Sequence, residues 1–331
     1  MMPKSICSRL AAASLILPLV CASSFAADLL TPKPQVKLPG KAAKFDFIQF
    51  DAARGRLLAS HTGKAALEVI DAATGKLIKS VPTGAAQDCA LSNGGAEYLV
   101  SVSKPPQVAM VDAETLAVTG TIPLDGPADL LTYDPVTQLA YVCHDDGKVL
   151  WMVSPSQKKV TGTIALPTQG PEDLATDATG KRLFQAMKRA GTLASFDAAT
   201  GKLLANWPTA PVQMPHGIAL VPEADAIAIS GGNGKLVLMS QSDGKILSSA
   251  AIPPRVDEIA YDRGAHRVYC ASGTGKIAVL AVEDGQLKPL GEVTSEPGAR
   301  SIAVNPRDHS VWIAYMGADG SYVQQFTPSA H

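Results

Sequence analysis

The sequence predicts an all-β protein, a seven-bladed β-propeller of four-stranded blades. The pattern of residues 127–134, an acidic residue entering an apolar strand, recurs seven times. By subtraction of residue numbers, successive copies lie 41 to 44 residues apart, a period typical of propeller blades. No stretch shows the sustained apolar spacing of a long helix. The residues aligned at one place in the repeat are Asp46, Asp88, Asp129, Asp173, His216, Asp257 and Arg300.

Residues 1–26 are predicted to be a secretory signal peptide. Lys4 and Arg9 form a positive region, an apolar run follows, and small residues precede Ala27. The apolar run is too short to cross a membrane. We therefore expect residues 27–331 to be a single propeller domain, exported to the periplasm or secreted.

Residues 173–207 show the expected blade most clearly. An inner strand from Asp173, a second strand over 183–187 and a third over 193–196 are separated by glycine-containing turns. The third strand leads into an Asp-Ala-Ala-Thr-Gly-Lys hairpin at 197–202, and the outer strand follows. Because closely similar hairpins recur elsewhere in the chain, we assign them a folding role and no function.

The two ends of the chain are predicted to close the ring. A proline ends almost every outer strand, as expected where no further strand pairs. The last repeat, 300–326, contains only three strands, whereas residues 35–39 form an apolar segment before the first inner strand. We expect residues 35–39 to supply the missing outer strand, because closure removes open sheet edges.

The charge and the apolar pattern of the chain argue against nucleic-acid binding and a membrane span, and its cysteines are expected to be structural. The net charge is −1, and loss of Lys4 and Arg9 with the signal gives −1 − 2 = −3. Without a basic patch the chain is not expected to bind nucleic acid, and no later segment is apolar enough to span a membrane. The mature cysteines are odd in number and lie in apolar strand patterns, so they are expected to be buried with at least one unpaired. They are Cys89, Cys143 and Cys270.

Short pieces of sequence recur among the repeats, namely Gly126-Pro127, Gly170-Pro171, Tyr141-Val142, Val268-Tyr269, Val69-Ile70-Asp71 and Val111-Asp112. In these pieces the chain resembles the YVTN-repeat family of secreted seven-bladed propellers. The resemblance covers about residues 35–326 and implies the propeller fold and an exported protein; it does not specify a function, because the family includes binding proteins and proteins without assigned activity. One departure is that many family members have glycine near the aligned position, where five residues here are aspartates. We expect the protein to be a monomer.

The seven aligned side chains are expected to encircle the upper mouth of the central channel. Loops between second and third strands should add His61 and His144, which we interpret as exposed loop residues. These loops should also add Lys188 and Arg189, interpreted as a solvated turn, together with Lys104 and Tyr315. A structural explanation for the aspartates is that each accepts backbone amides and fixes the crossover between blades. An argument against this explanation is that five carboxylates around one axis repel each other unless a cation lies among them.

Three functional interpretations use the same mouth. Asp129, Asp173, His216 and Asp257 are candidate ligands for a divalent cation, with Ca²⁺, Mg²⁺ or Mn²⁺ suited to oxygen donors and one imidazole. Alternatively, the acidic mouth binds a small cationic molecule or a periplasmic partner protein. In the third interpretation the protein is a metal-dependent hydrolase, lactonase or lyase. His216 then acts as general acid or base, and Arg300 holds an anionic group.

The sequence favours a binding or scaffold protein, with the enzyme as the alternative. An enzyme needs an enclosed pocket with its acid or base within reach of the substrate, whereas a binding protein needs only an open rim. Electron transfer with a quinone cofactor is a third alternative that no sequence feature requires.

Overall fold

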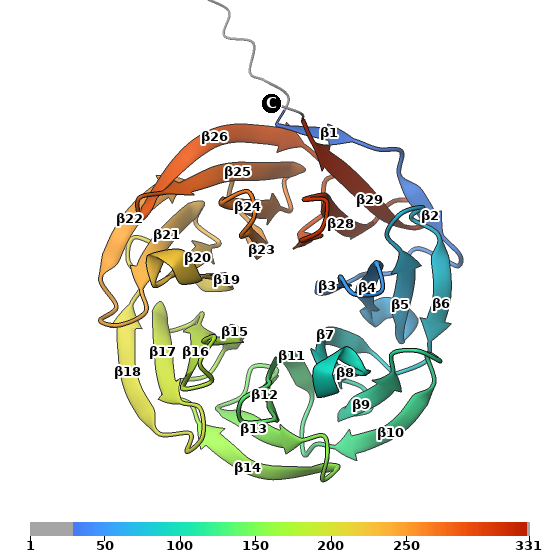
Figure 1. The fold of residues 1–331 in the computed structure, drawn as a ribbon, viewed down its shortest axis with the longest axis horizontal. Coiled ribbons are helices and arrows are strands. Elements are labelled where there is room, and N and C mark those ends of the chain that lie inside the picture. The colour runs from blue at the N-terminus through green and yellow to red at the C-terminus, as the bar shows by residue number, and fades with distance from the viewer. Residues whose placement is uncertain (1–28, 330–331) are drawn as a thin grey trace, which may run out of the picture.

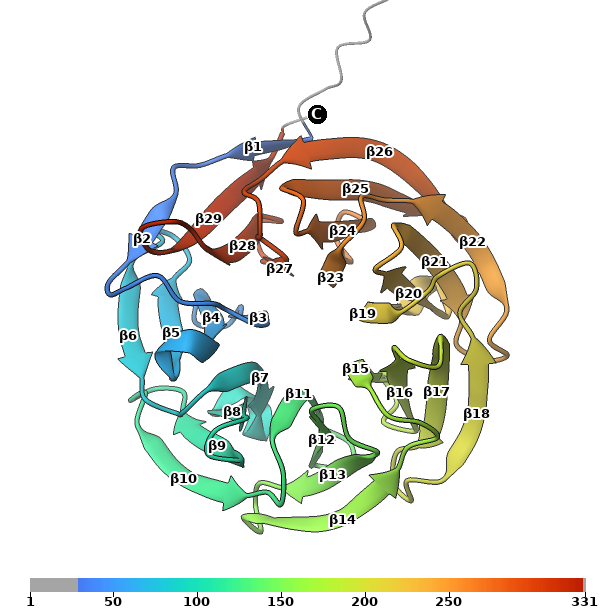
Figure 2. The ribbon, with the colours of Figure 1, turned by 180° about the vertical axis from the view of Figure 1, so that it is seen from behind.

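The computed structural model describes residues 29–329, which form a closed ring of seven antiparallel sheets (Figure 1). The predicted seven-bladed propeller is confirmed. Inner strands surround the axis and outer strands form the rim, as the opposite face also shows (Figure 2). The predicted signal peptide, residues 1–26, lies outside the described residues. No helix in the described range is long and apolar enough to cross a membrane.

Blades 1 to 3 each run from an inner strand to an outer strand. Blade 1 comprises β3 (Ile48–Asp51), β4 (Arg56–His61), β5 (Ala66–Asp71) and β6 (Leu77–Val81). Blade 2 comprises β7 (Ala86–Ser92), β8 (Glu97–Val102), β9 (Gln107–Asp112) and β10 (Val118–Pro123). Blade 3 comprises β11 (Ala128–Asp134), β12 (Leu139–His144), β13 (Val149–Ser154) and β14 (Lys159–Ala165).

Blades 4 to 6 repeat the same order. Blade 4 comprises β15 (Pro171–Thr176), β16 (Arg182–Met187), β17 (Thr192–Asp197) and β18 (Leu203–Pro208). Blade 5 comprises β19 (Pro215–Val221), β20 (Ala226–Gly231), β21 (Lys235–Ser240) and β22 (Ile246–Ala251). Blade 6 comprises β23 (Val256–Asp262), β24 (Arg267–Ser272), β25 (Lys276–Glu283) and β26 (Gln286–Thr294). The helical turns in the described range are η1 (Thr62–Lys64), η2 (Asn93–Gly95) and η3 (Pro222–Ala224).

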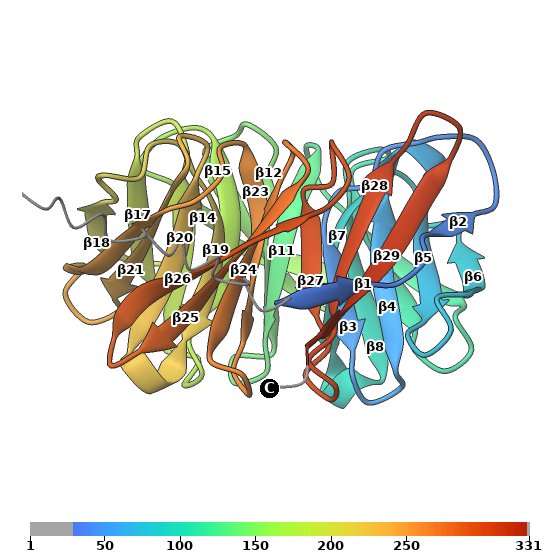
Figure 3. The same cartoon turned by 90° about the horizontal axis from the view of Figure 1, so that it is seen from above.

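Blade 7 joins the two ends of the chain. Its own strands are β27 (Ser301–Val304), β28 (Val311–Met316) and β29 (Ser321–Pro328). The segment β2 (Val36–Leu38) pairs antiparallel with β29, which confirms the closure predicted for residues 35–39. A second segment, β1 (Leu30–Pro32), pairs with the far end of β29 and lies along the outside of the ring (Figure 3).

The recurrent hairpin sequence is a turn held by one aspartate. Asp71 Oδ1 accepts hydrogen bonds from the backbone amide and the hydroxyl of Thr74, at 2.8 and 2.6 Å. Gly75 follows with φ of 71°, a left-handed conformation that glycine adopts without strain. The same pair of bonds joins Asp197 to Thr200 at 2.8 and 2.7 Å. The repeated motif therefore serves folding, as expected from the sequence.

Apolar side chains fill each of the seven interfaces between neighbouring blades. Between blades 1 and 2, for example, Leu58 and Val69 pack in one cluster with Cys89 and Val100. Each sheet is thus buried on both faces, which explains why its strands are apolar at successive positions. The three described cysteines are buried and unpaired, and burial raises the pKa of each thiol.

Candidate functional site

Strand register defines which side chains share a layer around the channel. Each blade has one apolar residue of the inner strand that lies opposite the equivalent residue of the second strand, and this residue serves as the reference position. In blade 3 it is Leu131, which lies opposite Val142. We name the residues two positions earlier the mouth ring, and those one position earlier the channel layer. The mouth ring consists of Asp46, Gln87, Asp129, Glu172, His216, Asp257 and Arg300. The channel layer consists of Phe47, Asp88, Leu130, Asp173, Gly217, Glu258 and Ser301.

This register corrects the alignment made from the sequence. Asp88 and Asp173 do not belong to the mouth ring, because each lies one residue further along its inner strand. Gln87 and Glu172 occupy the ring positions in blades 2 and 4. The sequence alignment placed acidic residues at equivalent positions. The strand pairing of the structure shifts at the start of each of these two inner strands, and this shift decides which residue lies in which layer. Asp173 is accordingly replaced by Glu172 as a candidate metal ligand.

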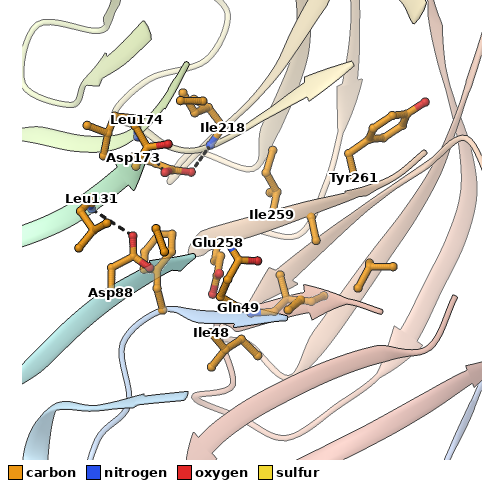
Figure 4. A pocket seen from close by; sticks show the side chains of 18 residues that line it. Ile48, Gln49, Asp88, Leu131, Asp173, Leu174, Ile218, Glu258, Ile259 and Tyr261 are labelled. Atoms are coloured by element: carbon orange, nitrogen blue, oxygen red, sulfur yellow. Dashed lines mark hydrogen bonds between the residues drawn. The ribbon is translucent and has the colours of Figure 1, made fainter. Parts of the chain in front are cut away.

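Asp88 joins blade 2 to blade 3. Its Oδ2 accepts the backbone N–H of Leu131 at 3.1 Å (Figure 4). Its Oδ1 accepts the N–H of Cys89 at 2.7 Å. Burial raises the pKa of the Asp88 carboxyl to about 7. This is the crossover role that the structural explanation of the aspartates predicts.

Asp173 in blade 4 and Glu258 in blade 6 make the same kind of hydrogen bond to the next blade, and we call these two residues and Asp88 the clamp acids. Asp173 accepts the N–H of Ile218 in blade 5 at 2.8 Å, and Glu258 accepts the N–H of Ile302 in blade 7 at 2.8 Å. Burial raises the pKa of Asp173 to about 7 and that of Glu258 well above its usual range. The clamp acids line a channel cavity of about 320 Å³ (Figure 4).

Three side chains of the mouth ring form a cluster with the composition of a metal site. One ligand atom each from Glu172, His216 and Asp257 lies within 4.8 Å of the others. They come from consecutive blades, so the closed ring holds them together although they are far apart in sequence. We call these three residues the mouth cluster.

The orientation of His216 favours a ligand role. Its Nδ1 lies 2.7 Å from the Met214 carbonyl oxygen, which accepts only, so Nδ1 carries the proton. Neutral His216 then presents the lone pair of Nε2, which lies 3.9 Å from Asp257 Oδ1. A carbonyl that fixes the tautomer in this way is the usual outer partner of a metal-binding histidine.

Two cations neutralise the carboxylates of the mouth cluster. Lys188 Nζ lies 2.7 Å from Glu172 Oε1, and Arg300 Nη1 lies 3.1 Å from Asp257 Oδ2. The mouth is therefore less acidic than the aspartate pattern implies, because two of its four carboxyl groups are already paired.

The other two acids of the mouth ring are held towards their protonated forms. Burial, reinforced by repulsion from Asp257, raises the pKa of Asp46 to about 7 even though Arg300 opposes the shift. Burial and then the charges of Asp46 and Glu172 raise the pKa of Asp129 well above its usual range. Neither residue belongs to the mouth cluster, so Asp129 is not brought together with His216 and Asp257 as predicted.

The two predicted loop histidines are not alike. His61 is fully buried, which contradicts its interpretation as an exposed residue. Its Nδ1 lies 3.0 Å from Glu68 Oε1 and its Nε2 lies 3.0 Å from Ser321 Oγ, so this seam network joins blades 1 and 7. The order serine, histidine and acid resembles a catalytic relay, but these side chains are at most 1% exposed, so a substrate has no access to them. His144 is half-buried and stacks on Trp151.

Sequence reasoning did not identify Glu172 and Glu258 as site residues. Each lies next to an aspartate, in Glu172-Asp173 and Asp257-Glu258, and the aspartate alone was aligned. The apolar residue that follows, Leu174 or Ile259, marks the register in the sequence and would have separated the two layers.

No protein-family model matches the chain, and no curated protein matches its sequence. Solved structures do match its shape. A chain of hydrazine synthase from Kuenenia stuttgartiensis is 15% identical with a TM-score of 0.76, and the match covers 89% of this chain and 97% of that one.

Two further solved structures share the shape at similarly low identity. The WD40 repeats of RRP9 are 11% identical with a TM-score of 0.76, over 89% and 98% of the two chains. A chain of the mitotic checkpoint complex is 12% identical with a TM-score of 0.78, over 98% and 100%. At these sequence identities the structural similarity establishes the propeller fold alone. Any function has to be inferred from the residues of the site.

Proposed function

We propose that this chain is an exported propeller that works as a binding protein, with a divalent cation held by the mouth cluster. The observation that carries the proposal is the convergence of Glu172, His216 and Asp257, whose ligand atoms lie within 4.8 Å of one another. Two carboxylates and one imidazole suit Mn²⁺ better than Ca²⁺ or Mg²⁺, which prefer oxygen donors alone. The fold supplies the rigidity, because each ligand lies at the start of a strand in a closed ring.

A cationic organic ligand is less well supported. Its attraction to the mouth requires free negative charge, but Lys188 and Arg300 already pair with Glu172 and Asp257. A small metal ion differs, because it approaches the lone pair of His216 and the unpaired carboxylate oxygens directly. A basic segment of a partner protein meets the same obstacle as an organic cation.

The alternative is a metal-dependent hydrolase or lyase at the same mouth. Three protein ligands leave coordination positions for water, as catalytic metal sites do, and Arg300 lies beside the cluster. However, His216 cannot bind the metal through Nε2 and also serve as the general base, because its Nδ1 is occupied by the Met214 carbonyl. This conflict favours binding over catalysis.

Metal titration tests the proposal. Purified protein is stripped with a chelator, dialysed, and titrated with Mn²⁺ and separately with Ca²⁺ by calorimetry. We expect one Mn²⁺ per chain, with affinity reduced at least about tenfold in Glu172→Gln and in His216→Ala. Asp46→Asn, a charge removal in the same ring outside the cluster, is the matched control. Absence of saturable Mn²⁺ binding would refute the proposal, and lactone turnover that is lost in Glu172→Gln would favour the enzyme.

A further inference from the structure

The mouth cluster is flanked by two positive side chains that remain accessible. Arg300 is 50% exposed and binds Asp257, and Lys188 is 37% exposed and binds Glu172. They come from opposite sides, since Arg300 precedes β27 of blade 7 and Lys188 follows β16 of blade 4. A molecule bound at the cluster therefore meets a cation on each side.

Charge balance indicates what such a molecule must be. Without metal, the two carboxylates of the cluster are matched by two cations, because Lys188 pairs with Glu172 and Arg300 pairs with Asp257. A divalent cation adds two positive charges to this balanced set. A partly desolvated excess of positive charge favours an anionic ligand.

The coordination number leads to the same conclusion. A six-coordinate ion such as Mn²⁺ receives three donors from the mouth cluster, which leaves positions for ligand oxygens. The guanidinium of Arg300 has the planar fork that binds a carboxylate through two hydrogen bonds. We propose that the metal-loaded mouth binds a small dicarboxylate, which chelates the metal and contacts Arg300 and Lys188. This inference rests on the proposed function.

The channel limits the size of this anion. Directly beneath the mouth ring lie the clamp acids Asp88, Asp173 and Glu258, whose carboxyl groups line the cavity (Figure 4). A carboxylate that entered further would lose its contacts with Arg300 and Lys188, and it would be repelled by the clamp acids wherever these are ionised. The dicarboxylate therefore stays at the mouth and does not pass along the channel.

The experiment uses malonate as the probe and uncharged malonamide as its control. Mn²⁺ binding is first measured alone, and each probe is then titrated into the Mn²⁺-loaded protein by calorimetry. Water-proton relaxation reports whether water leaves the bound metal. The variants are Arg300→Gln and Lys188→Gln. Arg189→Gln is the matched control, because Arg189 is a neighbouring exposed cation whose ion pair is with Asp146, outside the cluster.

We expect malonate to bind and displace water, and malonamide to bind at least about tenfold more weakly. Arg300→Gln should weaken malonate binding by at least about tenfold while Mn²⁺ affinity stays equal or rises, because Asp257 is released from its ion pair. Arg189→Gln should behave as wild type. If Mn²⁺ binds but malonate does not, or if malonamide binds equally well, this inference fails and the proposed function stands. If Mn²⁺ itself does not bind, both fail.

Discussion

Asp88 shows how one carboxyl group joins two sheets at the scale of a single residue. Its two oxygens accept one amide N–H within its own strand and one from the next blade, and the side chain is buried. Buried backbone donors are almost always paired, so the carboxyl completes the hydrogen bonding of the crossover. The same reasoning applies to Asp173 and Glu258.

Replacing Asp88 with alanine is expected to destabilise the fold. Two buried N–H groups lose their acceptor, and each unpaired donor costs about 1 to 3 kcal/mol. We expect the free energy of unfolding at pH 5 to fall by at least about 2 kcal/mol, measured by denaturant titration. Asp145→Ala, at an exposed carboxyl near the mouth, is the control and should change it by less than about 0.5 kcal/mol. Equal stability of the two variants would contradict the clamp role.

Single-residue assignments were the least predictable part of the site. The sequence identified the ring positions of Asp46, Asp129, His216, Asp257 and Arg300, because the repeat spacing is regular. It misplaced two aspartates because acidic residues occupy adjacent positions and spacing alone does not reveal an irregular pairing. It also misjudged His61, because burial of a loop histidine depends on partners such as Ser321, distant in sequence.

At the scale of elements, β1 and β2 cover the exposed edge of β29. Both pair with it antiparallel, and they bring Leu30 and Leu38 into the core, at 3% and 1% exposure. The sequence predicted β2 because the last repeat contains only three strands, whereas every other blade has four. It did not predict β1, because a three-residue strand that ends in proline is too short to show apolar periodicity.

Deletion of residues 27–40 should destabilise the whole ring. Loss of two buried leucines removes about 3 to 6 kcal/mol of apolar burial, and β29 becomes an open edge. We expect the melting temperature to fall by roughly 5 to 10 °C and the protein to aggregate more readily. A chain that begins at Leu29 retains both strands and is the matched control. An unchanged melting temperature after the longer deletion would contradict closure by the N-terminal strands.

At the scale of the molecule, the fold was predictable because seven similar units repeat one pattern. A single repeat has weak signals, but seven copies at a nearly constant period determine the blade number and strand order. Closure then follows from the edge that a three-stranded last blade leaves open. The chemistry was less predictable, since the mouth cluster combines side chains from three different blades and depends on their exact register.

Stability should decrease as pH rises through the neutral range. Asp46, Asp88 and Asp173 have folded-state pKa values of about 7, above the unfolded value near 4. Between these values the folded state binds more protons than the unfolded state, so each increase in pH favours unfolding. We expect the free energy of unfolding at pH 8 to be at least about 2 kcal/mol lower than at pH 5.

Denaturant titrations at constant ionic strength measure this dependence. Carboxyl groups with lowered pKa values, such as those of Asp51 and Asp71, lose their contribution only in more acidic solution, so they do not mask the trend between pH 5 and 8. The Asp88→Asn/Asp173→Asn double variant should show a shallower pH dependence, because two of the titrating groups are gone. A stability that rises from pH 5 to pH 8 would show that these acids are ionised in the folded protein.

The pairing of β1 with β29 has a mechanical consequence. Leu30 lies opposite Pro328, so the two ends of the described chain are neighbours and point out of the same end of an antiparallel pair. A force that pulls these ends apart loads the inter-strand hydrogen bonds one after another, like a zipper, instead of all together. The joint that closes the ring against thermal unfolding is therefore weak under tension, and a ring anchored by its two ends would open first at blade 7.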